Sequence, residues 1–488
     1  MEKQEAELIF IPFPITGHLL ATIELVKIIL SHDPRRINTI TILNWGLPFL
    51  PQSNNDASLQ SLAKSEPRVR IVTLPELANP PPMEFFVRAP EAYLLEFVKR
   101  MVPLVRDAVS TLLSSSRDGS DSVRVVGIVL DMFCVPLMDV GNELCLPSYI
   151  FLTCSAGFLS LAKHIPERHL RVKSGFDRSS GEEENTVPGY VASVPTKVLP
   201  LGLLTSESYD AWVNMTGRFH EAKGILVNSS IAIEPNAFGY FDRIPVNEHP
   251  PVYPVGPILC FNDRPILDPL ERDRVMTWLD EQPESSVVFL CFGSLKNLAA
   301  TQVKEIAQAL EIVGCRFLWS IRTDPKEYPN PFEILPDGFM NRVSGLGFVC
   351  GWAPQVEILA HKAIGGFVSH CGWNSILESL RFGVPIATWP MYAEQQLNAF
   401  TMVKELGLAL EMRLDYVLAD GEIVKADEIA RAVRSLMEGE DVPRGKLKEI
   451  AEAAKEAMMD GGSSFVAIER FIDEVVVSAM DCSKSREY

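Results

Sequence analysis

Short apolar runs alternate with helical hydrophobic patterns along both halves of the chain. Leu8–Phe13 is an apolar run of strand length, and Leu19, Ile23, Val26 and Leu30 follow it at spacings of three and four residues. Such spacings predict a strand followed by an amphipathic helix. Strands that alternate with helices form parallel sheets covered by helices on both faces. The pattern therefore predicts an α/β fold built on parallel sheets.

Further apolar runs predict the other strands in both halves. They are Thr39–Leu43, Val123–Leu130, Tyr149–Leu152, Gly224–Val227, Val287–Phe292, Phe317–Ile321, Gly347–Cys350, Ile364–Val368 and Pro385–Thr388. The segment Gln302–Val313 carries one apolar face and predicts a helix, with Thr301 as its N-terminal cap and Gly314 as its C-terminal cap. The polar segment Gln52–Leu59 predicts an exposed loop.

The length and the prolines predict two domains. The chain has 488 residues, and single cores rarely grow beyond about 250–300 residues. Six prolines fall within residues 250–269, and proline disrupts helix interiors and central strands. We predict an N-terminal domain at 1–248, a linker at 249–270, a C-terminal domain at 271–462, and a last helix with a tail at 463–488. The last helix carries an apolar stripe of Phe465, Ile468, Ile472 and Val475.

The composition limits the partners and the compartment. The formal net charge of −18 opposes binding to nucleic acid and stable association with anionic membranes, because both are polyanions. The first residues are acidic where a signal peptide is basic, and no apolar run approaches the length of a membrane span. Nine cysteines without a Cys-x-x-Cys pair indicate free thiols in a reducing compartment. We expect a cytoplasmic protein, and we expect it to be a monomer.

The densest cluster of polar and aromatic residues lies at 352–395. There the predicted strand Ile364–Val368 runs into a polar turn and then into a helix at 375–380. Free N–H groups at a helix start carry partial positive charge and bind phosphate. Additional side-chain donors at this junction come from His370, Asn374 and Ser375. Because the chain holds no Asp-x-Asp pair, this junction predicts a diphosphate site that needs no metal. Trp352 is suited to stack on a base, which stabilises binding by about 1–3 kcal/mol.

A histidine and an aspartate far upstream predict a catalytic pair. His18 follows the first predicted strand, and Asp131 directly follows Val123–Leu130. Parallel strands present their carboxyl ends at one edge of the sheet, where open α/β sheets bind ligands. A histidine with a pKa of about 6.5 is suited to take a proton from a hydroxyl near neutral pH. A neighbouring carboxylate fixes its tautomer and stabilises the imidazolium.

These motifs together resemble a known family. The block from Trp352 to Gln395 spans 44 residues, and it is similar in length and content to the signature box of plant secondary-product UDP-glycosyltransferases. Other landmarks of that family resemble Phe10–His18, Tyr253–Ile258 and Val288–Ser294. The resemblance implies two facing Rossmann-like, doubly wound domains of the GT-B type with a cleft between them. It also implies that the C-terminal helix crosses back to the N-terminal domain.

The resemblance implies roles for the nucleotide-binding residues. Trp352 would stack on uracil, while Ala353 would offer backbone contacts and Gln355 would reach the nucleoside. Glu378 would accept hydrogen bonds from the ribose. The diphosphate would be held by Ser294, His370, Asn374 and Ser375, beside Gly17 and Gly372.

The resemblance also implies how the sugar is held. Trp373, Glu394 and Gln395 would bind its hydroxyls, and Thr153 would contact the donor sugar or phosphate. In this family a closing glutamine accompanies glucose donors, although Glu394 stands where aspartate is commoner. UDP-glucose is therefore the expected co-substrate, with no metal and no other cofactor. UDP-galactose and UDP-xylose remain alternatives.

The acceptor is expected to be a small lipophilic molecule with a hydroxyl group. Its apolar pocket would come from the N-terminal half near His18. The candidate lining residues are Phe85, Phe86, Met132, Phe133, Phe158 and Tyr392. The motif at 129–136 is most similar to a subgroup that acts on flavonoids, phenylpropanoids and triterpenoids. The resemblance implies a single displacement that inverts the configuration at the anomeric carbon and gives a β-glucoside. The formation of glucose esters and transfer to nitrogen or sulfur remain open.

Three rival functions are less consistent with the sequence. A nicotinamide dehydrogenase needs a Gly-x-Gly-x-x-Gly turn after a strand, and none is present. A serine hydrolase of the nucleophile-elbow type needs Gly-x-Ser-x-Gly, and the nearest match, Thr153–Gly157, lacks the first glycine. A non-catalytic nucleotide-sugar binding protein would keep the block at 352–395 but would have no use for His18 with Asp131.

Overall fold

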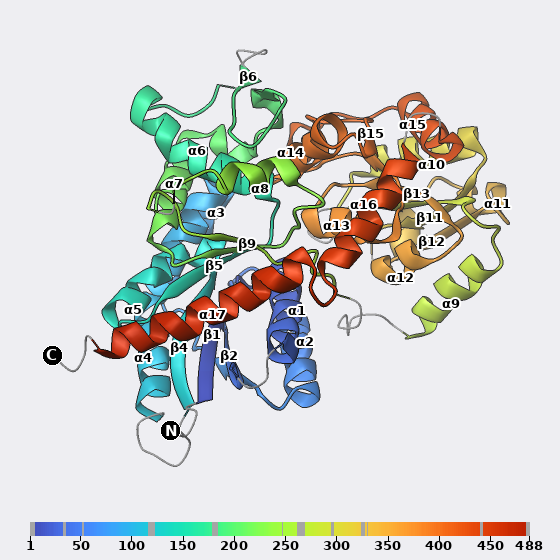
Figure 1. Ribbon diagram of the computed structural model, residues 1–488. Coiled ribbons are helices and arrows are strands. Elements are labelled where there is room, and N and C mark those ends of the chain that lie inside the picture. The colour runs from blue at the N-terminus through green and yellow to red at the C-terminus, as the bar shows by residue number, and fades with distance from the viewer. Residues whose placement is uncertain are drawn as a thin grey trace.

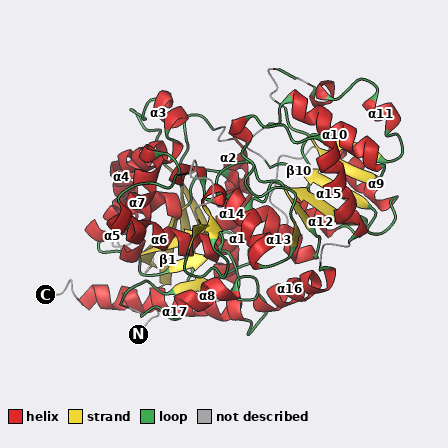
Figure 2. Ribbon diagram, turned by 90° about the horizontal axis from the view of Figure 1, so that it is seen from above, coloured by secondary structure: helices red, strands yellow, loops and turns green. Residues whose placement is uncertain are grey.

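A computed structural model describes residues 5–32, 36–50, 53–115, 123–177, 184–245, 247–260, 269–293, 297–323, 327–328, 330–439 and 443–484. Two large sheets, one of seven strands and one of six, form the two halves of the molecule, which lie side by side (Figure 1). Helices cover both faces of each sheet (Figure 2). The predicted α/β class, with two doubly wound halves, is confirmed.

The first sheet comes from the N-terminal half and is parallel throughout. Its strand order is β3-β2-β1-β4-β5-β8-β9. Its strands are β1 (Glu5–Ile11), β2 (Thr39–Asn44), β3 (Val69–Thr73), β4 (Val123–Asp131), β5 (Ser148–Leu152), β8 (Ile225–Val227) and β9 (Val252–Pro254). The central neighbours β1 and β4 end together, because Ile11 pairs with Leu130. This register brings the residues after β1 close to Asp131.

Two strands of this sheet were not predicted, and both lie at its edges. β3 has one fully buried residue, Val69, so its apolar pattern is weak. β9 falls inside the predicted linker at 249–270 and pairs with β8. An edge strand tolerates proline because one side of its backbone makes no ladder hydrogen bonds. The first sheet thus includes the beginning of the proline-rich segment.

Helices and short helical turns connect the strands of this half. The longer helices are α1 (Thr16–His32), α2 (Ser53–Ser65), α4 (Pro90–Ser115), α6 (Ala156–Val172) and α7 (Ser206–Thr216). The shorter elements are α3 (Met83–Arg88), η1 (Met132–Leu137), α5 (Met138–Glu143), η3 (Thr196–Val198), η4 (Leu201–Leu203), η5 (Phe219–Glu221), α8 (Pro235–Phe241) and the pair β6 (Glu184–Asn185) and β7 (Val194–Pro195).

The predicted loop at Gln52–Leu59 is wrong, because α2 begins at Ser53. Its polar residues are not solvent-facing throughout: Asn55 is buried and donates a hydrogen bond from Nδ2 to the carbonyl oxygen of Pro14 at 3.0 Å.

The second sheet comes from the C-terminal half and is also parallel, in the order β12-β11-β10-β13-β14-β15. Its strands are β10 (Val287–Cys291), β11 (Arg316–Ser320), β12 (Gly347–Cys350), β13 (Ile364–Ser369), β14 (Ile386–Thr388) and β15 (Ala409–Leu410). Its helical elements are α9 (Pro269–Asp280), α10 (Ala300–Val313), η6 (Pro331–Ile334), α11 (Phe339–Arg342), α12 (Gln355–Ala360), α13 (Trp373–Phe382), α14 (Gln395–Phe400), η7 (Thr401–Glu405), η8 (Leu418–Asp420), α15 (Ala426–Glu438) and α16 (Arg444–Ala457).

Of the two predicted caps of α10, the C-terminal one is confirmed and the N-terminal one is wrong. Gly314 ends the helix with a φ of 67°, a left-handed conformation that glycine adopts without strain. The N-terminal cap is Ala299 rather than Thr301, and it makes no side-chain capping bond. Thr301 instead lies within the first turn of the helix.

The last helix, α17 (Ser463–Lys484), returns to the N-terminal half, as expected. It follows α16 and runs alongside β4, β9 and α1 (Figure 1). Phe471 is fully buried, with its ring centroid 5.2 Å from that of Tyr149 and 5.9 Å from that of Tyr253. Ile468, Ile472 and Val475 of the predicted stripe are buried with it. Neither this helix nor any other in the described residues has both the length and the apolar character of a membrane span.

Phe471→Ala should destabilise the protein by about 3–5 kcal/mol, because it removes a buried aromatic ring and leaves a cavity. Urea unfolding followed by tryptophan fluorescence would show a lower midpoint. Val477→Ala on the same helix is the matched control, since Val477 is 55% exposed. Equal effects of the two substitutions would show that α17 does not stabilise the N-terminal half through this contact.

Candidate active site

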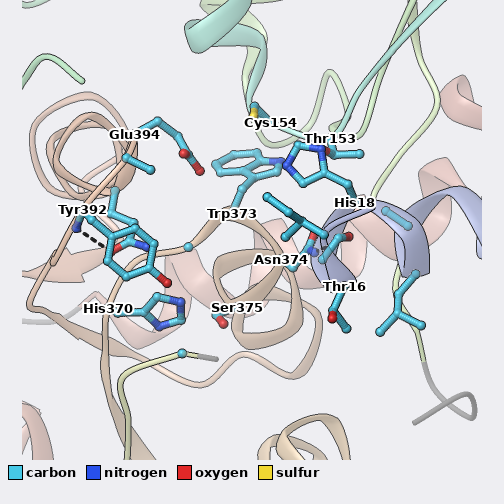
Figure 3. Close-up of a pocket in the computed structure, with 18 of the residues that line it drawn as sticks. Thr16, His18, Thr153, Cys154, His370, Trp373, Asn374, Ser375, Tyr392 and Glu394 are labelled. Atoms are coloured by element: carbon cyan, nitrogen blue, oxygen red, sulfur yellow. Dashed lines mark hydrogen bonds between the residues drawn. The ribbon is translucent and has the colours of Figure 1, made fainter. Parts of the chain in front are cut away.

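A cavity of about 370 Å³ lies between the two halves and is lined by residues from both. The N-terminal half contributes the turn after β1 and the residues that follow β4 and β5. The C-terminal half contributes the residues that follow β10, β11, β12 and β13. These are the carboxyl ends of parallel strands in both sheets, which is where open α/β sheets bind ligands. Figure 3 shows side chains of both halves pointing into this space.

A histidine paired with a buried aspartate lies on the N-terminal wall. Nδ1 of His18 is 2.7 Å from Oδ2 of Asp131, whose side chain is 1% exposed. The other carboxylate oxygen of Asp131 accepts a hydrogen bond from the backbone N–H of Phe133 at 3.0 Å. The hydroxyl oxygen of Thr153 also lies 3.1 Å from Nδ1 of His18. These contacts engage Nδ1 and leave Nε2 as the ring nitrogen available to a substrate.

Two opposing effects set the pKa of His18. Burial lowers this pKa, but the charge of Asp131 and its hydrogen bond raise it, and Glu394 adds a weaker upward effect. The net result is a pKa above the ordinary value for histidine. Glu394 belongs to the C-terminal half, so charges from both walls act on the imidazole.

The start of α13 forms the centre of the opposite wall. Gly372 is the N-terminal cap, and the helix begins at Trp373 directly after the turn that follows β13. Its first backbone N–H groups have no partners within the helix and carry partial positive charge. The described residues contain no cluster of three or more His, Cys, Asp or Glu side chains that could hold a metal ion. The helix start can itself attract an anionic group.

His370 lies beside this helix start and has a very different pKa from His18. Burial lowers the pKa of His370 to about 4, so its imidazole is neutral near pH 7. Two glycines allow the ring to approach the backbone: an added Cβ would lie 2.8 Å from Nε2 at Gly293 and 2.7 Å from Nε2 at Gly372. Gly293 also has a φ of 85°, which side chains rarely permit. A neutral imidazole is therefore held against the glycine backbone on both sides.

Two hydrogen bonds from the start of α13 cross to the N-terminal half. Nδ2 of Asn374 donates to the carbonyl oxygen of Gly17 at 3.0 Å. Nε1 of Trp373 donates to the carbonyl oxygen of Asn228 at 2.8 Å. The side chains of Asn374 and Trp373 thus link the two walls. The amide oxygen of Asn374 is buried without a hydrogen-bond partner among the described residues.

A polar network joins three residues of the predicted nucleotide site. Nε2 of Gln355 donates to the hydroxyl of Ser375 at 2.8 Å and to the carboxylate of Glu378 at 2.7 Å. Nearby, the guanidinium carbon of Arg322 lies 4.6 Å from the centroid of the Trp352 ring. Arg322 is the only lysine or arginine among the described residues that line the cavity, and burial lowers its pKa.

Comparison with known proteins gives the family. A family model described as "UDP-glucoronosyl and UDP-glucosyl transferase" matches residues 210–440. UDP-glycosyltransferase 71C2 of Arabidopsis thaliana is 75% identical over 472 residues, which cover 97% of this chain and 99% of that protein. The chain belongs to the plant UDP-glycosyltransferases. Flavonol 3-O-glucosyltransferase UGT71C1 of Arabidopsis thaliana is 71% identical over 477 residues, 98% of each chain.

A solved structure agrees with this membership and with the GT-B architecture. The glycosyltransferase superposes on Medicago truncatula UGT71G1, solved in complex with UDP-glucose, with a TM-score of 0.88 and 42% sequence identity. The match covers 97% of this chain and 98% of the other. The prediction of a UDP-glycosyltransferase enzyme of the two-domain type is thereby confirmed.

Most of the predicted site residues of the glycosyltransferase line this one cavity. Those predicted to bind the donor are Gly17, Thr153, Trp352, Ala353, Gln355, His370, Gly372, Trp373, Asn374, Ser375, Glu378, Glu394 and Gln395. Ser294 lies outside the described residues. The amide oxygen of Gln395 accepts hydrogen bonds from the backbone N–H groups of Met391 at 2.9 Å and Tyr392 at 3.1 Å. This side chain is thus held by its oxygen, and its amide nitrogen remains as a donor.

The structure brings four of the six acceptor candidates into the cavity. They are Met132, Phe133, Phe158 and Tyr392. Phe85 and Phe86 do not line it. Their rings pack against Tyr93, with centroids 6.2 and 5.4 Å away, so they belong to the hydrophobic cluster of the N-terminal half.

The sequence analysis missed several residues of the cavity wall, among them Glu91, Trp212 and Arg322. Arg322 directly follows the predicted strand Phe317–Ile321, so the strand-end rule would have found it. Glu91 and Trp212 lie in helical regions with no motif around them, and only the fold brings them to the cavity.

Asp131→Asn should shift the acid limb of kcat/KM to lower pH and reduce kcat by about 10²-fold or more. The raised pKa of His18 means that the neutral base is present above that pKa and is lost as the pH falls through it. Asparagine removes the charge that raises this pKa and stabilises the imidazolium. Initial rates between about pH 5 and pH 9 would measure both effects. The exposed Asp139→Asn is the control, and an unmoved acid limb in Asp131→Asn would contradict the role of Asp131.

Proposed function

We propose that this glycosyltransferase transfers glucose from UDP-glucose to a hydroxyl group of a small aromatic acceptor, with flavonols as the leading class. The observation that carries the proposal is the contact of 2.7 Å between His18 and Asp131, on the cavity wall opposite the start of α13. A base that faces an anion-binding helix start across a cavity can take the proton from an acceptor hydroxyl, which then attacks a sugar linked to phosphate. The name of the relative UGT71C1, which is 71% identical, supports the acceptor class.

The proposed reaction is a single displacement. Nε2 of His18 takes the proton from the acceptor hydroxyl as the oxygen attacks the anomeric carbon of glucose. The new carbon–oxygen bond forms while the bond from that carbon to the diphosphate breaks, and UDP leaves toward the start of α13. One displacement inverts the configuration, so an α-linked donor gives a β-glucoside. Asp131 stabilises the imidazolium formed in this step.

The donor is proposed to bind along the C-terminal wall. Uracil would stack on Trp352, and the ribose would bind the Gln355–Glu378 network. The diphosphate would meet the N–H groups at the start of α13 and a neutral His370. Arg322 supports this assignment, because it supplies the wall with a permanent positive charge to oppose the charge of UDP.

His18→Ala should abolish glucose transfer while UDP binding survives, because the substitution removes the base without touching the donor wall. We expect kcat to fall by about 10³-fold or more. Mass spectrometry would measure the glucoside, and calorimetry would measure the Kd for UDP. His220→Ala, at an exposed histidine, is the control. If His18→Ala kept its turnover, the proposed mechanism would be wrong; if no wild-type donor and acceptor pair gave a glucoside, the proposed function would be wrong.

Transfer from UDP-glucose should continue unchanged in EDTA and should exceed transfer from UDP-galactose and UDP-xylose. In the proposed site the helix start and Arg322 supply the positive charge that a metal would otherwise supply, and Glu394 and Gln395 bind the hydroxyl groups of the sugar. Rates for the three donors, each with and without chelator, would be compared on one flavonol. A loss of activity that Mg²⁺ restores would contradict the metal-independent site. Activity with UDP-galactose alone would contradict the choice of glucose.

A further inference from the structure

Apolar side chains of the N-terminal half line much of the proposed acceptor side of the cavity, among them Leu94, Met132, Phe133 and Phe158. Two residues with polar groups, Glu91 and Trp212, also line the cavity. A carboxylate in an otherwise apolar pocket is costly to desolvate unless it has a binding partner.

The fold holds these two groups close to one glycine. Glu91 lies in the first turn of α4 and Trp212 lies in α7, while Gly202 lies between them in η4. A Cβ added to Gly202 would lie 2.4 Å from Oε1 of Glu91 and 2.5 Å from Nε1 of Trp212. Both polar atoms therefore converge on the same point, and only glycine leaves room for them.

Each of the two groups has one buried polar atom without a hydrogen-bond partner among the described residues. These atoms are Oε2 of Glu91 and Nε1 of Trp212. Most buried polar atoms in proteins have a partner, and an unpaired one is a cost to stability. A negative charge at Glu91 also stabilises the N-terminus of α4. Glu84 stabilises the N-terminus of α3 in the same way although its side chain is exposed. Stabilisation of the helix start therefore does not by itself require a buried carboxylate oxygen at Glu91.

A row of aromatic rings connects this pair to the catalytic base. The Phe133 ring centroid lies 5.8 Å from that of His18 and 6.2 Å from that of Trp212. Phe158 is on the same row, with its centroid 5.6 Å from that of Trp212. An aromatic acceptor that lies along this row with one hydroxyl at His18 has its opposite end near Glu91 and Trp212.

We propose that Glu91 and Trp212 bind a second hydroxyl group at the far end of the acceptor. A hydroxyl both donates and accepts, so it can donate to the carboxylate of Glu91 and accept from the indole N–H of Trp212. The site would select aromatic acceptors with hydroxyls at both ends, and it would disfavour a carboxylate at the far end because Glu91 repels it. This inference rests on the proposed function and specifies its acceptor.

The test compares two flavonols with UDP-glucose as the donor: 3-hydroxyflavone, which has a single hydroxyl, and kaempferol, which carries others on both ring systems. Wild-type kcat/KM should favour kaempferol by about tenfold or more. Glu91→Leu and Trp212→Phe should each remove most of this preference by raising KM for kaempferol, with little change for 3-hydroxyflavone. Glu91→Gln should give an intermediate result, because the amide oxygen still accepts a hydrogen bond but carries no charge.

Exposed Glu84→Leu on α3 is the matched control and should keep the wild-type preference. Thermal unfolding and turnover of 3-hydroxyflavone report whether each variant folds. If Glu91→Leu does not fold, Trp212→Phe tests the inference instead. A wild type without preference, or an equal loss for both acceptors in Glu91→Leu and Trp212→Phe, would overturn the inference. If the wild type glucosylated neither flavonol, the proposed acceptor class would fail instead.

Discussion

The site depends on two parallel sheets being held with their strand ends facing each other at a fixed separation. Neither half carries the complete proposed chemistry, because the proposed base, His18, comes from the first half and the proposed anion-binding helix start comes from the second. Two of the hydrogen bonds that join the halves lie at the cavity: the bond from Asn374 to Gly17, 3.0 Å long, and the bond from Trp373 to Asn228, 2.8 Å long. Since Gly17 precedes His18 directly, the first of these bonds ties the base to the start of α13.

The helix α17 adds a second constraint at the opposite side of the structure. It begins next to α16 of the C-terminal half and buries Phe471 against the first sheet. At its first turn, the hydroxyl of Ser464 donates to the carbonyl oxygen of Gly256 at 2.6 Å. The two halves are thus joined by an apolar contact outside the cavity and by hydrogen bonds at its edge. The hydrogen bonds at the edge of the cavity do not fill it, and the packing of Phe471 stabilises the protein from outside the cavity.

Features that arise from local pattern can be predicted from the sequence, whereas features that arise from long-range packing cannot. The proximity of His18 and Asp131 could be predicted because each follows an apolar run of strand length. The pairing of Trp373 with Asn228 has no such signal, because the two residues are 145 positions apart. The place of Phe85 and Phe86 outside the cavity wall could not be predicted for a related reason: an aromatic side chain has the same local pattern in a core and in a pocket. Glu91 carries no pattern at all, since a glutamate near a helix start is ordinary on an exposed surface.

The two imidazoles of the cavity show how the surroundings divide the chemistry between the walls. Both are enclosed by protein, and burial lowers the pKa of each. His18 has Asp131 beside it, so its pKa is raised nevertheless, whereas burial dominates at His370 and its pKa falls to about 4. In the proposed reaction a positive charge develops on the first wall and a negative charge on the second. Asp131 stabilises the former, while a neutral His370 can donate to the departing diphosphate without competing for the acceptor proton.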